Sequence, residues 1–188
     1  DSNETEYDPY TKNEFSNEYK KFIESDIRPL INEIDTDNFS EISLDPSLND
    51  KVVNYYSSQS MDLNSLPIDI YNKAKKGDIN AMFDFGNILL EPIETNAIDK
   101  KYENLAIYWI LLAAQNEIPE AMILIGSFHF TGNSTLINKD PKKGRILFDR
   151  GIELFSQYSS INDAKDIYNN FLKENSLLGI HHMDYPYY

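Results

Sequence analysis

The chain has 188 residues, 41% of them hydrophobic and 13% aromatic, with a formal net charge of −14 at pH 7 and no cysteine. This length and composition suit one folded domain with a buried core. The acidity argues against nucleic acid as a partner, because phosphate binding needs clustered Lys and Arg, and the lack of cysteine excludes disulfides, thiolate metal sites and cysteine nucleophiles.

The first third of the chain holds most of the negative charge, with 15 acidic and 5 basic side chains in residues 1–65. Residues 1–11 are polar and acidic, and we expect them to be a disordered leader. Apolar residues at steps of three and four predict a helix over 13–34, which must tolerate Pro29 or kink there. Residues 35–50 are rich in Asp, Ser, Asn and Pro and are predicted to be a linker. Residues 12–65 are thus expected to form an N-terminal helix and an acidic linker, with a short apolar segment at 52–56 that docks on the fold.

From residue 66 the pattern changes to successive helices. They are predicted over residues 67–76, 80–90, 101–116, 119–130, 141–157 and 161–175, with loops at 92–99 and 131–140. Proline stands at the expected first turn of three of them, at Pro67, Pro119 and Pro141. Residues 66–175 are therefore predicted to be one helical region, followed by an irregular tail at 176–188.

An internal repeat with a period of forty residues is the most informative feature of the chain. Residues 74–86 align with residues 114–126, and four residues recur: Ala74, Ala81, Met82 and Gly86 return as Ala114, Ala121, Met122 and Gly126. A period of this size is typical of stacked helical solenoids. We expect the small residues to let helices approach closely and two aromatic residues to fill the space between helix pairs. The small residues are Ala81, Gly86, Ala113, Ala121 and Gly126, and the aromatic ones are Trp109 and Phe148.

The repeated unit resembles the Sel1-like repeat, a relative of the tetratricopeptide repeat. One copy reads Ala81, Phe85-Gly86, Leu89, Ala106, Trp109 and Ala113-Ala114; the next reads Ala121, Ile125-Gly126, His129, Gly132, Asp140, Gly144, Phe148 and Gly151. The first copy departs from the family pattern at Leu90-Glu91, where a glycine is expected, and the second replaces the double alanine with Arg150-Gly151. The resemblance covers residues 66–157. It implies an all-α fold, a short α-solenoid of helix-turn-helix repeats with flanking capping helices.

Within this family the chain most resembles the N-terminal repeats of lumenal adaptors of the Hrd type of ubiquitin ligase, which serve endoplasmic-reticulum-associated degradation. The likeness lies in the acidic leader, the irregular loops and the order of the helices. It implies a protein–protein adaptor or scaffold in the endoplasmic reticulum lumen or secretory pathway, linked to protein quality control and to a membrane-associated complex. The alternative is an activator or assembly-factor subunit that supports a membrane enzyme or complex, with a cytoplasmic or mitochondrial location.

Partner contacts are expected on the first helix of each pair, which usually lines the concave face of a solenoid. The positions there that the repeat pattern does not use are Phe83, Asp84, Asn87, Ser127 and Phe130. Asn133 begins a glycosylation sequon in the predicted loop 131–140, and further sequons begin at Asn3 and Asn38. The expected partners are one or more proteins. We expect no nucleic acid and no insertion of this chain into a membrane, since no apolar run reaches the length of a bilayer. The chain begins at Asp1, which suggests a processed form or a part of a longer protein.

The sequence carries no motif of a catalytic or cofactor site. Phosphate loops, Gly-x-Ser-x-Gly and His-Glu-x-x-His do not occur, so we expect neither enzyme activity nor a cofactor. The adjacent His181 and His182 point in different directions and are interpreted as exposed tail residues rather than metal ligands. The stretch from Asp35 begins like a calcium loop but lacks its later Gly and Glu, so no metal is expected. His129 takes an aromatic position of the repeat, which predicts a packed core residue.

Overall fold

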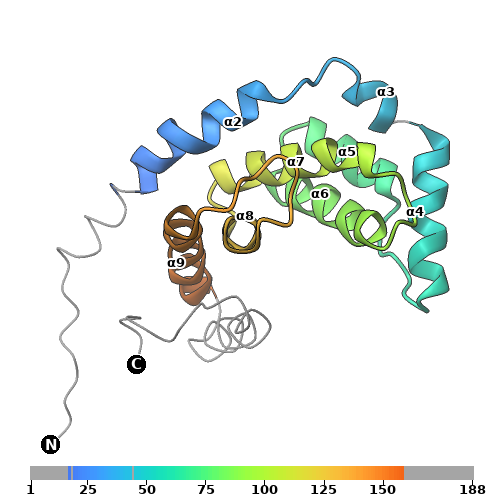
Figure 1. Ribbon diagram of the computed structural model, residues 1–188. Helices are drawn as coiled ribbons and strands as arrows, with labels where there is room; N and C mark the ends of the chain where they lie inside the picture. Colours follow the sequence, from blue (N-terminus) through green and yellow to red (C-terminus); the bar gives the residue numbers. More distant parts are fainter. Residues whose placement is uncertain (1–16, 18, 44, 159–188) are drawn as a thin grey trace, which may run out of the picture.

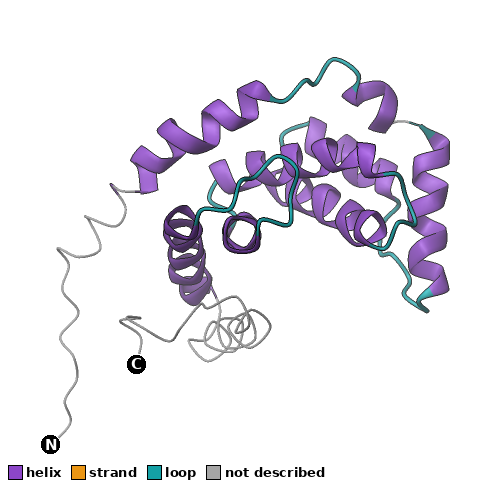
Figure 2. Ribbon diagram, in the orientation of Figure 1, coloured by secondary structure: helices purple, strands orange, loops and turns teal. Residues whose placement is uncertain are grey.

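The computed structural model describes residues 17, 19–43 and 45–158, and within them all regular secondary structure is helical (Figures 1 and 2). The predicted all-α class is confirmed. The predicted helix at 161–175, the tail and the leader 1–11 lie outside the described residues. In chain order the elements are η1 (Ile23–Ile27), α2 (Arg28–Glu33), α3 (Phe39–Ser43), α4 (Pro46–Ser58), α5 (Pro67–Lys75), α6 (Ile79–Glu94), η2 (Lys100–Tyr102), α7 (Glu103–Gln115), α8 (Pro119–Thr131) and α9 (Pro141–Tyr158).

Helices α5 to α9 pack in chain order, each against the next (Figure 1). Proline occupies the first turn of α5 and of α8, where its missing N–H leaves no helical bond unmade. Their facing sides form one continuous apolar core. A helical repeat predicts that each helix packs against the next one in the chain, as it does here. The solenoid assignment itself stays a prediction.

The forty-residue repeat is visible in the backbone of the turns that end α5 and α7. Gly77 and Glu117 occupy equivalent positions, and their φ angles are 96° and 60°. In each turn this residue's N–H donates to the carbonyl three residues back, and the next N–H donates to the carbonyl five residues back, at 2.9 to 3.2 Å. This pair of bonds is the Schellman arrangement, which satisfies the last carbonyls of a helix. The two copies therefore end their helices in the same way.

Small residues bring the helix backbones into direct contact, as the repeat predicts. A Cβ atom on Gly86 would lie 2.6 Å from the carbonyl oxygen of Ala106 and 2.5 Å from Cγ1 of Ile110, so the backbone of α6 packs directly on the backbone of α7, beside the Ile110 side chain. A Cβ atom on Gly126 would lie 2.9 Å from the carbonyl oxygen of Gly144, so α8 and α9 do the same. The remaining small repeat residues are at most 5% exposed: Ala81, Ala113 and Ala121.

Aromatic rings fill the space between successive helices. The indole of Trp109 on α7 meets Tyr71 of α5 and Phe85 of α6 edge-on, with centroids 5.9 and 6.3 Å apart. Phe148 on α9 is fully buried and meets Phe130 of α8 at 6.3 Å. Edge-on contacts of this kind hold neighbouring helices in a defined register.

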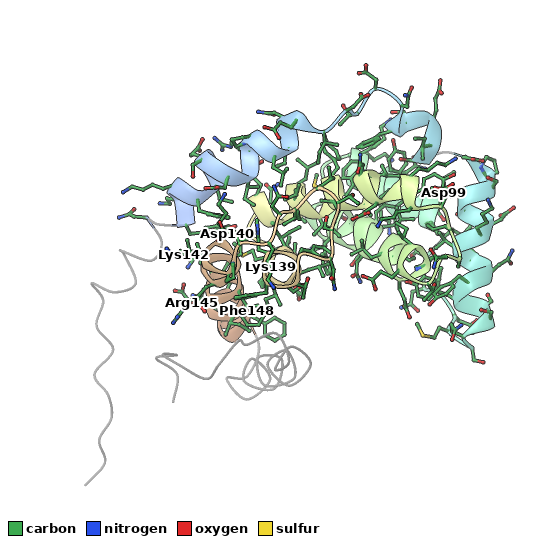
Figure 3. The ribbon with its side chains drawn as sticks, in the orientation of Figure 1. Asp99, Lys139, Asp140, Lys142, Arg145 and Phe148 are labelled. Atoms are coloured by element: carbon green, nitrogen blue, oxygen red, sulfur yellow. The ribbon has the colours of Figure 1, made fainter. Side chains whose placement is uncertain are left out.

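Aspartates cap the helical segments that follow the two longer loops of the repeat region. The side chain of Asp99 accepts a hydrogen bond from the N–H of Lys101 at 2.8 Å, just before η2 and α7. The side chain of Asp140 accepts from the N–H groups of Lys142 and Lys143 at 3.1 and 3.2 Å, at the start of α9. Figure 3 shows the two aspartates at opposite sides of the molecule, Asp99 beside α4 and Asp140 beside α9. Each carboxylate satisfies helical N–H groups that have no partner inside the helix.

The N-terminal region is more helical than predicted, and the expectation of a linker over residues 35–50 is wrong where α3 and α4 lie. The side chain of Asp45 accepts a hydrogen bond from the N–H of Ser47 at 2.8 Å, and Pro46 occupies the first turn of α4. Val52 is fully buried. The Asp-Pro-Ser run that indicates a linker is also the composition of a helix start.

Helices η1 to α4 wrap over the row formed by α5 to α9 (Figure 1). At one end the hydroxyl of Tyr19 donates to the carbonyl oxygen of Ala114 at 2.8 Å, and Asp26 forms a salt bridge with Lys143 of α9. At the other end α4 packs on α5 and α6, where a capping helix is expected. The sequence predicts that the helix must tolerate Pro29 or kink there. The structure places Pro29 in the first turn of α2, directly after the five-residue π-helical turn η1.

Candidate functional site

A groove opens between the end of α4, the loop 59–66, and helices α5 and α6. Its volume is about 480 Å³, which is in the range of ligand sites on proteins. We call it the α4–α6 groove. Its apolar lining is Tyr56, Met61, Leu63, Ile70, Ala81 and Ile88, and its polar lining is Asp62, Asn64, Ser65, Lys73, Asp78, Asn80, Asp84 and Asn87.

Two of the lining residues, Tyr56 and Ile88, form an unusual bond between α4 and α6. Helix α6 continues to Glu94 through Pro92, so the prediction that it ends near residue 90 is wrong. Proline has no N–H, and therefore the carbonyl of Ile88, four residues earlier, loses its helical donor. The hydroxyl of Tyr56 on α4 donates to this carbonyl oxygen at 3.2 Å. Burial raises the pKa of Tyr56 to about 12.

Met61 stands at the rim of the groove in a fixed backbone turn. Ser60 has a φ of 59°, and the N–H of Met61 donates to the carbonyl of Tyr56 at 2.9 Å. The Met61 side chain is 48% exposed, and in the described part of the chain it is one of three large apolar side chains with such exposure. A flexible, exposed thioether beside the apolar lining residues of the groove is suited to contact with another protein.

The polar lining is dominated by negative charge, with three aspartates and one lysine. Asp78 caps α6, because its side chain accepts a hydrogen bond from the N–H of Ala81 at 3.0 Å. Asp62 and Asp84 lie beyond ion-pair distance of every basic side chain in the described residues. Two carboxylates of the groove are thus open to a positively charged group from outside.

Burial and like charge both act on Asp84. Partial burial raises the pKa of the Asp84 carboxyl above its ordinary value, and the neighbouring carboxylates of Asp78 and Glu120 raise it further. Glu120 belongs to the first turn of α8, so acidic groups of α6 and α8 influence one another. The resulting negative potential favours a cation at this position.

The sequence-predicted partner residues have different surroundings. Asp84 and Asn87 are exposed and line the groove together. Phe83 is half-buried and packs against the core, and Ser127 is half-buried, with its hydroxyl donating to the carbonyl of Leu124 at 2.7 Å. Phe130 is only 6% exposed, so it presents no surface to a partner in this structure. The expectation that Phe130 contacts a partner directly is therefore wrong for this structure, because its ring packs on Phe148 inside the α8–α9 pair.

The loop that carries Asn133 is tied to the helices beside it. The N–H of Thr135 donates to the carboxylate of Glu103 on α7 at 2.9 Å, and Nδ1 of His129 on α8 donates to the carbonyl of Asn138 at 2.9 Å. His129 is buried, which confirms the prediction of a packed core residue, and burial lowers its pKa. Asn133 is exposed on this loop, where a glycan could be carried.

The other expectations concern metals and membranes. Among the described residues no three side chains of metal-binding type are grouped, and His181 and His182 lie outside these residues. No helix of the described chain is long and apolar enough to cross a membrane. No family model matches the chain, and neither a curated protein nor a solved structure is significantly similar to it.

Proposed function

We propose that this protein is a protein–protein adaptor or scaffold that binds a segment of another protein in the α4–α6 groove. The observation that carries the proposal is the composition of the groove. Apolar side chains line it, Met61 is held exposed at its rim, and two carboxylates beside them have no ion-pair partner among the described residues. Sites that recognise proteins typically combine apolar side chains with polar and charged groups in this way.

The Sel1-like assignment is part of this proposal and rests on the repeated residues of the sequence. The equivalent turns at Gly77 and Glu117 and the close backbone approach at Gly86 and Gly126 are consistent with it. The location in the endoplasmic reticulum lumen or secretory pathway, and the role in quality control of the degradation type, rest on the resemblance to lumenal ubiquitin-ligase adaptors. They are proposed on that basis.

The proposal is tested by affinity purification of the tagged full-length protein from its native cell, followed by mass spectrometry. The groove variant combines Met61→Ser with Asp84→Asn, and Glu94→Gln, an exposed position of α6 outside the groove lining, is the matched control. We expect partners that are recovered with the wild type and the control but lost with the groove variant. Equal recovery by all three proteins would contradict a binding role of the groove.

The identity of the recovered proteins separates the proposed roles. A membrane ubiquitin ligase together with a lectin or chaperones supports the quality-control adaptor. A single stoichiometric enzyme or assembly complex supports the activator or assembly-factor role instead. No recovery above background with the wild type counts against both roles.

A further inference from the structure

The lining of the α4–α6 groove combines apolar side chains with carboxylates that have no ion-pair partner among the described residues. The inference drawn below from this lining rests on the proposed protein-binding function of the groove. We propose that the groove selects an extended protein segment that carries a lysine or arginine beside an aliphatic side chain. The apolar lining would take the aliphatic group, and the carboxylates of Asp62 and Asp84 would take the cation.

The apolar half of the site is formed by side chains from three helices and one loop. Ile70 of α5, Ile88 of α6 and Leu63 of the loop contribute aliphatic surface, and Met61 extends it to the rim. Tyr56 of α4 also lines the groove, and its hydroxyl already donates to the carbonyl oxygen of Ile88. This part of the groove therefore offers apolar surface, which suits an aliphatic or methylene-rich side chain.

The charged half favours a cation over an anion. Asp62 and Asp84 have no basic side chain within ion-pair distance in the described residues, while Lys73 is the single basic residue of the lining. An acidic segment would meet three aspartates, and like charges at an interface are strongly disfavoured. The chain's net charge of −14 extends the same preference to longer distance.

Side-chain amides around the groove suit the backbone of an extended segment. Asn80 and Asn87 on α6 are exposed, and in the described part of the chain their amides make no hydrogen bond. Each amide can both donate to a carbonyl and accept from an N–H group of a peptide. An extended segment has such groups unpaired, whereas a helix has already used them.

The test is selection of displayed random peptides on the immobilised full-length protein, followed by affinity measurement with the enriched peptides in solution. The proteins compared are the wild type, Asp62→Asn/Asp84→Asn, Met61→Ser and the control Glu94→Gln. We expect the wild type to enrich peptides with Lys or Arg next to an aliphatic residue. Loss of both carboxylates should lower the affinity for these peptides about tenfold or more. Added salt should lower the affinity of the wild type for them, but that of the double variant much less.

Each other outcome overturns the inference in a distinguishable way. The enriched peptides could lack a basic residue and still bind the Met61→Ser protein more weakly than the wild type. This result would overturn the charge selection while leaving the groove a protein-binding site. No enrichment, together with groove-dependent partners in the affinity purification, would show that the groove does not recognise short extended segments. No enrichment and no such partners would remove the proposed function as well. Folding of each variant is checked by circular dichroism and thermal unfolding, so that a loss of binding is not a loss of structure.

Discussion

Single residues decide how closely the helices pack and what the groove presents to solvent. Glycine at position 86 gives α6 and α7 a backbone contact that no other residue allows, since an added Cβ would lie 2.5 Å from Cγ1 of Ile110 and 2.6 Å from the main-chain oxygen of Ala106. Asp84 presents a carboxylate in a place where burial and like charge disfavour it. The first residue serves stability, whereas the second lowers it.

The Gly86→Ala substitution is expected to destabilise the fold. A Cβ atom would lie 2.6 Å from the carbonyl oxygen of Ala106, so α6 and α7 must move apart. Overpacking of this kind costs about 1–3 kcal/mol of the free energy of unfolding, which exceeds the gain in helix propensity. Chemical denaturation measures this change in the free energy of unfolding. The control is Asn104→Ala at an exposed position of α7, which is expected to raise the free energy of unfolding slightly or leave it unchanged. A more stable Gly86→Ala protein would contradict the close packing.

The Asp84→Asn substitution is expected to stabilise the fold at neutral pH. Because the pKa of Asp84 is raised in the folded state, the ionised carboxylate lowers the free energy of unfolding at pH values above that pKa. The carboxyl is only partly buried and water screens it, so the gain should be about 0.5 kcal/mol or less. It should vanish at acid pH, where the carboxyl is protonated in both the folded and the unfolded state. A loss of stability at neutral pH, or a gain that does not change with pH, would contradict this account.

At the scale of the elements, the N-terminal helices complete the repeat region. Helix α4 supplies the donor that α6 lacks at Ile88, and the side chain of Asn49 on α4 accepts from the N–H of Ile68 on α5 at 3.3 Å. The other end of the N-terminal region is tied to α7 by Tyr19 and to α9 by Asp26. One wall of the candidate groove therefore exists only because α4 docks on α5 and α6.

The coupling of Tyr56 to Pro92 is testable by a double-mutant cycle. Tyr56→Phe leaves the carbonyl of Ile88 without a donor and is expected to cost about 1–3 kcal/mol of the free energy of unfolding. In the Pro92→Ala background the new N–H of residue 92 can donate to that carbonyl, so the same change should cost about 1 kcal/mol less. Urea unfolding of the four proteins gives the coupling energy. Equal costs in both backgrounds would show that the hydroxyl does not replace the missing helical bond.

At the scale of the whole molecule, most of the repeat region could be predicted from the sequence, because periodicity and proline at the first turn mark the starts of α5, α8 and α9. Helix α4 could not, since Asp45 and Pro46 indicate a linker and a helix start equally well. The groove could be predicted only in part. Asp84 and Asn87 follow from their place on the first helix of a pair, but Tyr56 and Met61 reach the site through tertiary contacts that no local pattern contains.

The proposed secretory location leads to a prediction about Asn133. This residue is exposed on a loop that Glu103 holds through the N–H of Thr135, and Ser134-Thr135 completes its sequon. In the native cell we expect a glycan at Asn133, which is detected as a mass decrease after endoglycosidase treatment and is absent from Asn133→Gln. An unmodified Asn133 in a protein purified from a eukaryotic secretory host would count against the lumenal proposal.

The central claim is that the α4–α6 groove meets another protein, and site-specific photocrosslinking in the native cell tests it most directly. A photoreactive amino acid is placed at Met61, on the rim of the groove, or at Glu94, exposed on α6 outside it. We predict light-dependent crosslinks to a defined partner from position 61, reduced by Asp84→Asn, and none to that partner from position 94. No crosslink from position 61, or the same crosslinks from both positions, would contradict the claim.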